Sequence, residues 1–224
     1  MTLGAPRLHL RVTDSTSERA KAIARDAPHG LLVTASEQTA GHGRQGRSWS
    51  APAGEGLLMS LVLREWPGML PLAAAVAVAE TAGPDARIKW PNDVLVGDRK
   101  VAGILIEVRP AEGWAVLGIG VNVAVGEFPE ELSDIAGSLG RAPGDVEPFL
   151  AALLAGLDRW LAADAAEVIE AWSARDALRG REISWNGGAG TADGVDADGR
   201  LLVRQDGGGV VTLDAGEVHL ERPG

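Results

Sequence analysis

The chain has 224 residues, a formal net charge of −10 from 21 basic and 31 acidic side chains, and no cysteine. This length suits one large domain, or one domain with a small appendage, that buries its own core, and the missing cysteines exclude disulfides and thiolate metal sites and fit a reducing cytosol. The acidic balance argues against nucleic-acid binding, and no apolar stretch could span a bilayer, so we expect a cytoplasmic protein without a nucleic-acid or membrane partner.

The first third of the chain predicts alternating strands and helices. Residues 8–12 alternate as in a strand, and the spacing of Ser15 and Glu18 fits a capping box before a helix over residues 18–26. Residues 31–36 and 56–63 predict apolar strands, and the alanine-rich residues 72–82 predict a buried helix. Ser15 serves as a helix N-cap on the simplest interpretation, but the hydroxyls of residues 15–17 also form a polar pocket at a helix N-terminus.

A glycine-rich segment separates the second and third strands. Residues 38–54 contain no acidic residue, while Arg44 and Arg47 lie among glycines 41, 43 and 46. This glycine spacing does not indicate a dinucleotide-binding fold, because Pro52 and Gly54 follow where that fold begins a helix, and kinase and Walker motifs are absent. A solvated surface loop explains the glycines; a mobile lid whose arginines bind phosphate also explains the local charge. Trp49 fits either the core or a stacking platform.

Two of the three lysines of the chain flank one turn. Residues 87–89 predict a short extended segment, Pro91 and the next two residues a turn, and residues 94–96 and 100–108 a β-hairpin. An ordinary turn is the alternative interpretation. Lys89 and Lys100 would instead place two positive charges near Asn92 and Asp93. Asp93 would then hold Mg²⁺ or orient an incoming amine, and Lys100 would neutralise a reacting carboxylate and phosphate. Gly103 leaves room for a ligand.

The remainder predicts one more long strand, two helices and a small β module. Residues 114–123 predict a strand in which Asn122 interrupts the apolar pattern, and its amide needs a partner such as an adenine edge. Residues 147–163 and 168–174 predict helices. Short strands are expected at 182–185, 194–195, 201–203, 210–213 and 218–220, with residues 207–209 at a hairpin tip. The fold class is therefore α+β, with a mixed-sheet domain over residues 1–176 and an SH3-like β-barrel over residues 177–224.

Five segments, taken in order, resemble the biotin–protein ligases. They are Asp14-Ser15-Thr16, Glu37 through Trp49, Lys89-Trp90-Pro91-Asn92-Asp93, Arg99 through Glu107, and Gly118-Ile119-Gly120-Val121-Asn122. The resemblance implies a fold similar to class II aminoacyl-tRNA synthetases and biotin–lipoate ligases. It also implies a two-step reaction: biotin and ATP, with Mg²⁺, form biotinyl-adenylate, which then acylates one lysine on the biotin carboxyl carrier domain of acetyl-CoA carboxylase or a related carboxylase.

The resemblance and the residue pattern together assign the site. Lys100, Arg44 and Asp93 are the expected catalytic residues, with Asp93 also the expected Mg²⁺ ligand. The expected biotin-binding residues are Ser15, Thr16, Ser17, Gln38, Gly41, His42, Gly43, Lys100 and Gly103. The expected ATP- and adenylate-binding residues are Arg44, Arg47, Trp49, Lys89, Asn92, Lys100 and Asn122. The four histidines, at 9, 29, 42 and 219, lack metal-ligand spacing, so no zinc is expected.

The sequence departs from the family pattern in two respects. Position 42 is His where Arg is common in the family, which would weaken adenylate retention if the family uses the guanidinium. The chain begins at the catalytic domain, so a ligase without a DNA-binding repressor domain is expected.

The rival functions are those of a lipoate–protein ligase or octanoyl transferase, and of a non-catalytic biotin-binding module. Edge strands near residues 100–107 would allow two copies to pair as a homodimer.

Overall fold

The computed structural model describes residues 3–214, 216 and 218–220, and two sheets organise this part of the chain. The larger sheet has seven strands in the order β1-β2-β3-β7-β6-β5-β4. β1 and β2 run parallel, and every other neighbouring pair is antiparallel. The expected α+β class with a mixed sheet is confirmed.

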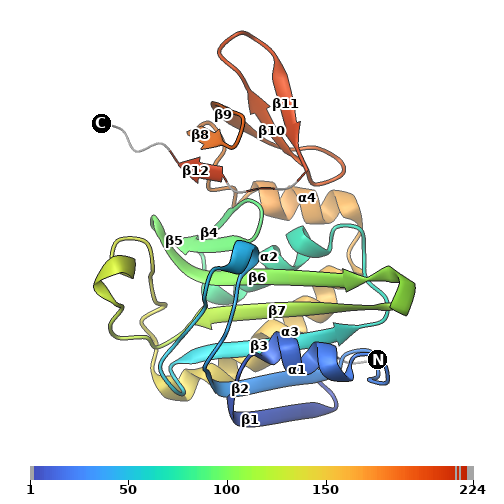
Figure 1. Ribbon diagram of the computed structural model, residues 1–224. Helices are drawn as coiled ribbons and strands as arrows, with labels where there is room; N and C mark the ends of the chain where they lie inside the picture. The colour runs from blue at the N-terminus through green and yellow to red at the C-terminus, as the bar shows by residue number, and fades with distance from the viewer. Residues whose placement is uncertain (1–2, 215, 217, 221–224) are drawn as a thin grey trace.

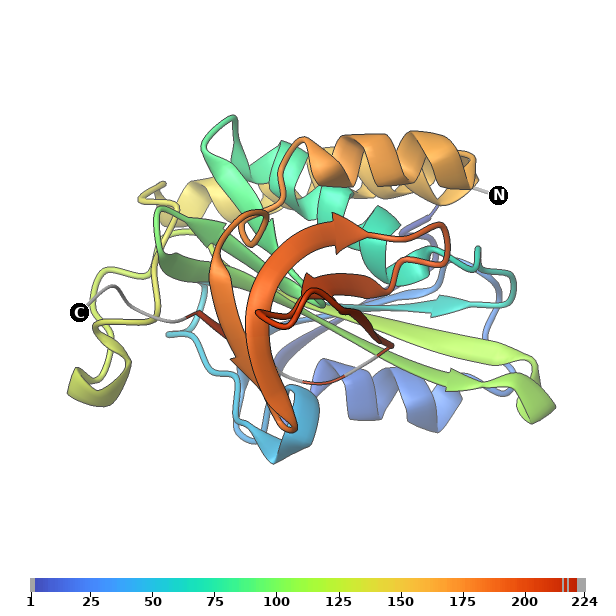
Figure 2. The ribbon, with the colours of Figure 1, turned by 90° about the horizontal axis from the view of Figure 1, so that it is seen from above.

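The larger sheet lies between helices on both of its faces. The bounds of these strands and helices are β1 Arg7–Thr13, α1 Thr16–Ile23, β2 Leu32–Gln38, β3 Gly56–Leu63, α2 Leu70–Ala82, β4 Ala86–Lys89, β5 Asp93–Val96, β6 Arg99–Arg109, β7 Trp114–Asn122, α3 Val146–Ala162 and α4 Ala165–Ser173. Helix α1 packs on β2, β3 and β7. Helix α2 packs on β4, β5 and β6 and against α3 and α4. Figures 1 and 2 show α1 on one face of the sheet and the other helices on the opposite face.

The helices on the second face follow from their apolar residues. Residues Leu72 through Ala79 of α2 are all buried, because the sheet lies on one side of this helix and α3 on the other. Helix α3 buries one stripe, which consists of Phe149, Leu150, Leu153, Leu157 and Trp160. Both helices confirm the sequence prediction within two residues. No helix in the described part of the chain is long and apolar enough to cross a membrane.

Helix α1 begins and ends earlier than the sequence predicts. Ser15 is the N-cap, and its hydroxyl accepts a hydrogen bond from the Glu18 N–H at 3.5 Å, so the helix begins at Thr16. Beyond Ile23, the guanidinium of Arg64 donates to the carbonyl oxygens of Ala24 and Ala27. The predicted extension to residue 26 is therefore wrong: residues 24–26 form a turn before Pro28, and Arg64 satisfies carbonyl oxygens beyond the end of the helix.

The smaller sheet is antiparallel and has the order β11-β10-β9-β8-β12. Its strands are β8 Glu182–Trp185, β9 Gly188–Val195, β10 Leu201–Arg204, β11 Val210–Leu213 and β12 Val218–Leu220. Figure 2 shows β9 curving strongly, and the sheet is consistent with an SH3-like module. The expected hairpin tip at residues 207–209 is confirmed between β10 and β11.

Two strand predictions need correction. Strand β9 begins at Gly188, six residues before the predicted start, because its residues pair with both β8 and β10 despite a composition typical of turns. Gly190 fits there because a side chain would meet the carbonyl oxygen of Arg204. Strand β6 pairs with β7 along its length and with β5 at its start, so residues 100–103 lie inside the sheet and are not an edge. A homodimer stays a prediction.

The smaller sheet is attached to the hairpin formed by β4 and β5. The Ile88 N–H donates to Arg175 O at 2.7 Å, and the Ala177 N–H donates to Ile88 O at 2.9 Å. The buried indole of Trp90 donates from Nε1 to Gly199 O at 3.2 Å. The predicted domain boundary at residues 176 and 177 lies within this connection and stays a prediction. A displacement of the smaller sheet would therefore also change the positions of residues 88–93.

Asp176, in this connection, has a carboxyl group whose titration is coupled to folding. Burial raises the pKa of Asp176, and backbone hydrogen bonds from Leu178 and Arg179 oppose the rise only partly. A carboxyl whose folded-state pKa is raised stabilises the fold below its unfolded pKa of about 3.9, and this contribution is lost as pH rises through the folded-state pKa. We therefore expect the free energy of unfolding of Asp176→Asn, relative to that of the wild type, to increase as pH rises from the unfolded pKa of about 3.9 through the folded-state pKa.

Urea unfolding at several pH values measures this difference. An amide at position 176 keeps an oxygen to accept the 2.8 Å bond from the Leu178 N–H, so the backbone contact is matched. The exposed Asp206→Asn is the control variant. If the free-energy difference between Asp176→Asn and the wild type does not change with pH, the carboxyl does not carry this pH dependence.

Candidate active site

A cavity of about 430 Å³ opens on the α1 side of the larger sheet. Its floor is formed by β3, β6 and β7, and its walls come from the start of α1, the loop over residues 42–50, the β5–β6 hairpin, residues 128–136 and strand β12. A narrow recess of about 10 Å³ shares Arg44, Arg47, Lys89, Asn92 and Asp93 with it. Segments far apart in the sequence therefore meet at one site.

One end of the cavity is polar and built from the first turn of α1. Thr16 and Ser17 are 4% and 6% exposed, and both line the cavity with Gln38 at the end of β2. The Thr16 N–H donates to Gln38 Oε1 at 2.7 Å. This bond fixes the amide of Gln38, so that its NH₂ group is the part left to meet other partners.

The glycine-rich loop is a compact turn. Arg44–Gly46 form one 3₁₀ turn, η1, in which Gln45 and Gly46 have φ of 56° and 74°. The turn is closed by a 2.6 Å bond from Gly43 N–H to Arg47 O and a 2.8 Å bond from Trp49 N–H to Gly41 O. The left-handed backbone at Gly46 explains the glycine there.

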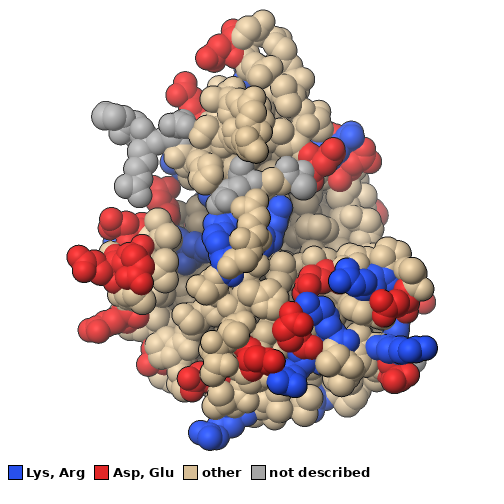
Figure 3. All heavy atoms as spheres, in the orientation of Figure 1, with Lys and Arg blue, Asp and Glu red and all other residues tan. Residues whose placement is uncertain are grey.

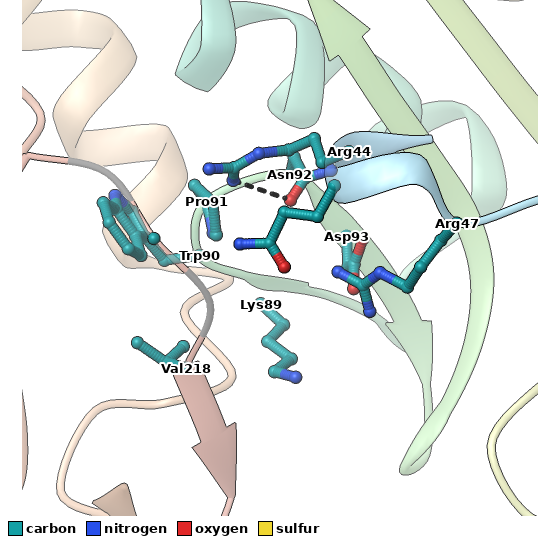
Figure 4. A pocket seen from close by; sticks show the side chains of 10 residues that line it. Arg44, Arg47, Lys89, Trp90, Pro91, Asn92, Asp93 and Val218 are labelled. Atoms are coloured by element: carbon teal, nitrogen blue, oxygen red, sulfur yellow. Dashed lines mark hydrogen bonds between the residues drawn. The ribbon is translucent and has the colours of Figure 1, made fainter. Parts of the chain in front are cut away.

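Four cationic side chains line the cavity, and they come from two parts of the chain. Arg44 and Arg47 come from the loop, and Lys89 and Lys100 come from β4 and β6. Arg44 Nη1 donates to Asn92 Oδ1 at 3.3 Å, which ties the loop to the turn that follows Trp90 (Figure 4). Figure 3 shows Lys and Arg atoms gathered in a recess at the middle of this face, below the smaller sheet. The cavity can therefore bind an anionic ligand despite the overall charge of −10.

Lys100 lies between a carboxylate and an aromatic ring. Its Nζ is 2.6 Å from Asp93 Oδ1 and 5.5 Å from the centre of the Trp49 ring. The Lys100 and Asp93 side chains are 29% and 16% exposed, so water still reaches the pair. Asp93 and Gly103 face each other across β5 and β6, which places the ammonium group over the cavity floor.

Trp49 lies flat against the sheet because two strand positions lack side chains. A Cβ atom at Gly120 would collide with the indole, and one at Gly103 would lie 3.2 Å from Trp49 Cζ3. The stacking-platform interpretation of Trp49 is therefore the one that its position favours. Its Nε1 is buried and has no hydrogen-bond partner among the described residues.

Asn122 has one half of its amide bound and the other half unbound. Nδ2 donates to Gly137 O at 2.9 Å, which holds the segment after β7. Oδ1 is buried and, in the described part of the chain, accepts no hydrogen bond. A buried carbonyl oxygen of this kind needs a donor, and the exocyclic amine of adenine is a suitable one.

Most residues that the sequence predicts for the site line this cavity. Ser15 and Gly41 do not: Ser15 caps α1, as in its simpler interpretation, and Gly41 lies behind the wall, where a side chain would meet Gln38 and Trp49. His42 lines the cavity, with Nε2 3.4 Å from Glu18 Oε1. Their assigned roles in binding stay predictions.

An apolar wall of the cavity escaped the sequence prediction. Phe128, Leu132, Ile135 and Ala136 line the cavity from the segment after β7, and Ile135 is 53% exposed. The segment between Gly126 and Gly137 also carries four acidic residues, so it resembles a solvated loop. The sequence signal for this wall was the spacing of Leu132 and Ile135 close to Phe128, one of the two phenylalanines of the chain. His219 and Leu220 of β12 were missed as well.

No group of three His, Cys, Asp or Glu side chains among the described residues could hold a metal ion by itself. Asp93 and Asp98 are the carboxylates that line the cavity. Mg²⁺ that arrives with a nucleotide commonly takes one or two protein carboxylates and completes its shell with phosphate and water. The donor set therefore fits such an ion and does not fit a dedicated protein cage.

Comparison with known proteins identifies relatives over most of the chain. A profile of the Biotin/lipoate A/B protein ligase family matches residues 9–123. The biotin--[acetyl-CoA-carboxylase] ligase of Paracoccus denitrificans is 38% identical over 237 residues, which cover 92% of this chain and 97% of that protein. The bifunctional ligase/repressor BirA of Bacillus subtilis is 42% identical over 158 residues, and the chain spans about half (49%) of its length.

A solved structure has the same fold. The biotin protein ligase from Aquifex aeolicus in complex with biotin and ATP has a TM-score of 0.83 and 29% identity, and the match covers 98% of this chain and 100% of that one. The mixed sheet and the ordered sequence segments therefore agree with these comparisons. The chain belongs to the Biotin/lipoate A/B protein ligase family.

Proposed function

We propose that this protein activates biotin with ATP and transfers the biotinyl group to a lysine of a biotin carboxyl carrier domain. One observation carries the proposal: a single cavity joins a polar end at Thr16 and Gln38 to a cluster of four cations. An uncharged polar head group and a triphosphate can thus be bound with the carboxylate and α-phosphate near each other. The biotin--[acetyl-CoA-carboxylase] ligases among its relatives, which are 38% and 35% identical over 92% and 93% of this chain, support the same reaction.

In the first step, a carboxylate oxygen of biotin attacks the α-phosphorus of ATP, and pyrophosphate leaves. Both reactants are anionic, so the attack requires positive charge that is already in place. Lys100 is the central cation, because it stands over the cavity floor beside Trp49. Arg44 and Arg47 lie at the recess shared with Lys89, where they would bind the departing phosphates.

Mg²⁺ would be held by Asp93, with Asp98 as the second available carboxylate. When bound, this ion would reduce the negative charge of the phosphates. The protein's own cations, Arg44, Arg47, Lys89 and Lys100, line the same cavity and would act on the same phosphates.

In the second step, a lysine amine of the carrier attacks the acyl carbon of biotinyl-adenylate, and AMP leaves. Asp93 is our candidate to orient this amine or to accept its proton. Its 2.6 Å contact with Lys100 supports this role, because the proposed reaction would use both groups at one centre. The apolar wall at Phe128 and Ile135 and the ring of Trp49 would keep water from the mixed anhydride.

A transfer assay tests the proposal. Purified protein, radiolabelled biotin, MgATP and a carrier fragment are expected to give a labelled carrier and to release pyrophosphate, with no label when the acceptor lysine is changed to arginine. Binding of biotin without pyrophosphate release would indicate a non-catalytic binding module and would contradict the proposal.

Lipoate and octanoate serve as competing substrates in the same assay, because the matching family includes lipoate ligases. We expect biotinyl-adenylate to be the acyl-adenylate detected by mass spectrometry. Preferential formation of lipoyl- or octanoyl-adenylate would instead assign the protein to the other branch of the family.

A further inference from the structure

Strand β3 carries one polar side chain on the face covered by α1, and this residue is fully buried. Ser60 is 0% exposed and lies between Leu58 and Val62, whose side chains point to the same face of the strand. An apolar residue would fill this position without needing hydrogen bonds. Ser60 does not line the cavity, so its hydroxyl acts through its neighbours.

The hydroxyl of Ser60 connects two residues that do line the cavity. Ser60 Oγ donates to Thr16 Oγ1 at 2.9 Å, and Ser60 Oγ lies 3.1 Å from Ser17 Oγ. A hydroxyl has one proton to donate. Because Ser60 gives its proton to Thr16, Ser17 must be the donor in its bond with Ser60. The three hydroxyls therefore form a chain of fixed direction, from Ser17 through Ser60 to Thr16.

This direction decides which hydrogen-bonding role Thr16 offers to a ligand. The Thr16 hydroxyl already accepts from Ser60, and among the described residues its own proton has no acceptor. Gln38 is oriented in the same sense, because its oxygen accepts the Thr16 N–H and its NH₂ group remains a donor. Thr16 and Gln38 thus present donors, which favour a ligand with a carbonyl oxygen, while Ser17 has given its proton to Ser60 and is left as an acceptor.

We propose that Ser60 is a positioning residue that fixes Thr16 as a hydrogen-bond donor to the ureido oxygen of biotin. The inference rests on the proposed function, since it assumes that biotin is the ligand. It adds a residue outside the cavity whose hydroxyl selects for a carbonyl acceptor. Without Ser60, Thr16 can rotate its proton toward other partners, and the donor is no longer fixed in place before the ligand binds.

The test compares biotin with 2-iminobiotin, in which a protonated imino group replaces the ureido oxygen and offers no acceptor. Titration calorimetry on the wild type and on Ser60→Ala gives Kd for both ligands. We expect Ser60→Ala to weaken biotin binding about tenfold and to leave binding of 2-iminobiotin nearly unchanged, so that selectivity for the carbonyl falls. Thr81→Ala, which removes a hydroxyl bonded only to Ala77 O, is the control.

The outcomes separate the inference from the proposed function. Equal weakening of both ligands would mean that Ser60 is merely structural and would overturn the inference, as would unchanged biotin binding. If the wild-type protein bound no biotin at all, the proposed function would fail. In transfer assays, the variant is expected to raise KM for biotin about tenfold while kcat and KM for ATP stay close to wild type.

Discussion

Replacement of Lys100 by alanine is expected to lower the rate of biotinyl-adenylate formation about 100- to 1000-fold. The lost ammonium is the cation closest to Asp93 and Trp49, and the attack of one anion on another depends on it. Lys100→Arg is not expected to restore the rate, because a planar guanidinium is larger and directs its donors differently from a compact ammonium. Pyrophosphate release in single-turnover experiments measures this step.

The fold of Lys100→Ala should remain intact. Partly exposed ion pairs contribute about 0–1 kcal/mol to stability, and Lys100 is 29% exposed. Arg109→Ala removes one positive charge from the exposed end of the same strand and serves as the control. Adenylate formation at the wild-type rate in Lys100→Ala would show that the role given to Lys100 is wrong.

Replacement of Arg44 by glycine is expected to release biotinyl-adenylate before transfer. Arg44 ties the glycine-rich loop to Asn92, and it also lines the recess with Arg47 and Lys89. The loss of one charge-assisted hydrogen bond costs about 1.5–3 kcal/mol, which corresponds to dissociation about 10- to 100-fold faster. The free adenylate would then acylate lysines on unrelated proteins.

Labelling of an added bystander protein, followed with labelled streptavidin, measures this release. The exposed Arg87, which donates to backbone carbonyls outside the cavity, supplies the matched control Arg87→Gly. A variant that labels only its carrier would contradict the assignment of Arg44. Because the expected effect is on release, the rate of adenylate formation is a separate readout that identifies a general loss of activity.

Local sequence patterns were sufficient for most of the larger sheet. The apolar run of residues 56–63 and the hairpin around residue 97 have strong periodicity and turn chemistry, and both elements are present where they were predicted. The closeness of Asp93 to Lys89 and Lys100 also follows from sequence proximity, because β4, β5 and β6 form two successive hairpins. In these cases the geometry is determined by interactions between residues that are close in the sequence.

The features that escaped prediction depend on contacts between distant residues. Arg64 binds carbonyl oxygens that follow the end of α1, and β9 forms from a weak strand sequence because two neighbours pair with it. The wall at Phe128 takes part in the cavity only because its segment returns to the sheet, and the hydroxyl of Ser60 acquires its role only when α1 packs on β3. Periodicity within a segment holds no information on such partners.

The bond between the Trp90 indole and Gly199 O joins the smaller sheet to the turn that carries Lys89 and Asn92. Separating the two sheets would break this bond and expose a large aromatic surface to water. Binding of a nucleotide at this turn, as proposed, would therefore also stabilise the attachment of the C-terminal strands to the larger sheet, by the linkage of binding to folding. The stability of the C-terminal sheet would therefore depend on whether the site is occupied, although its strands add only a few side chains, such as His219 and Leu220, to the cavity.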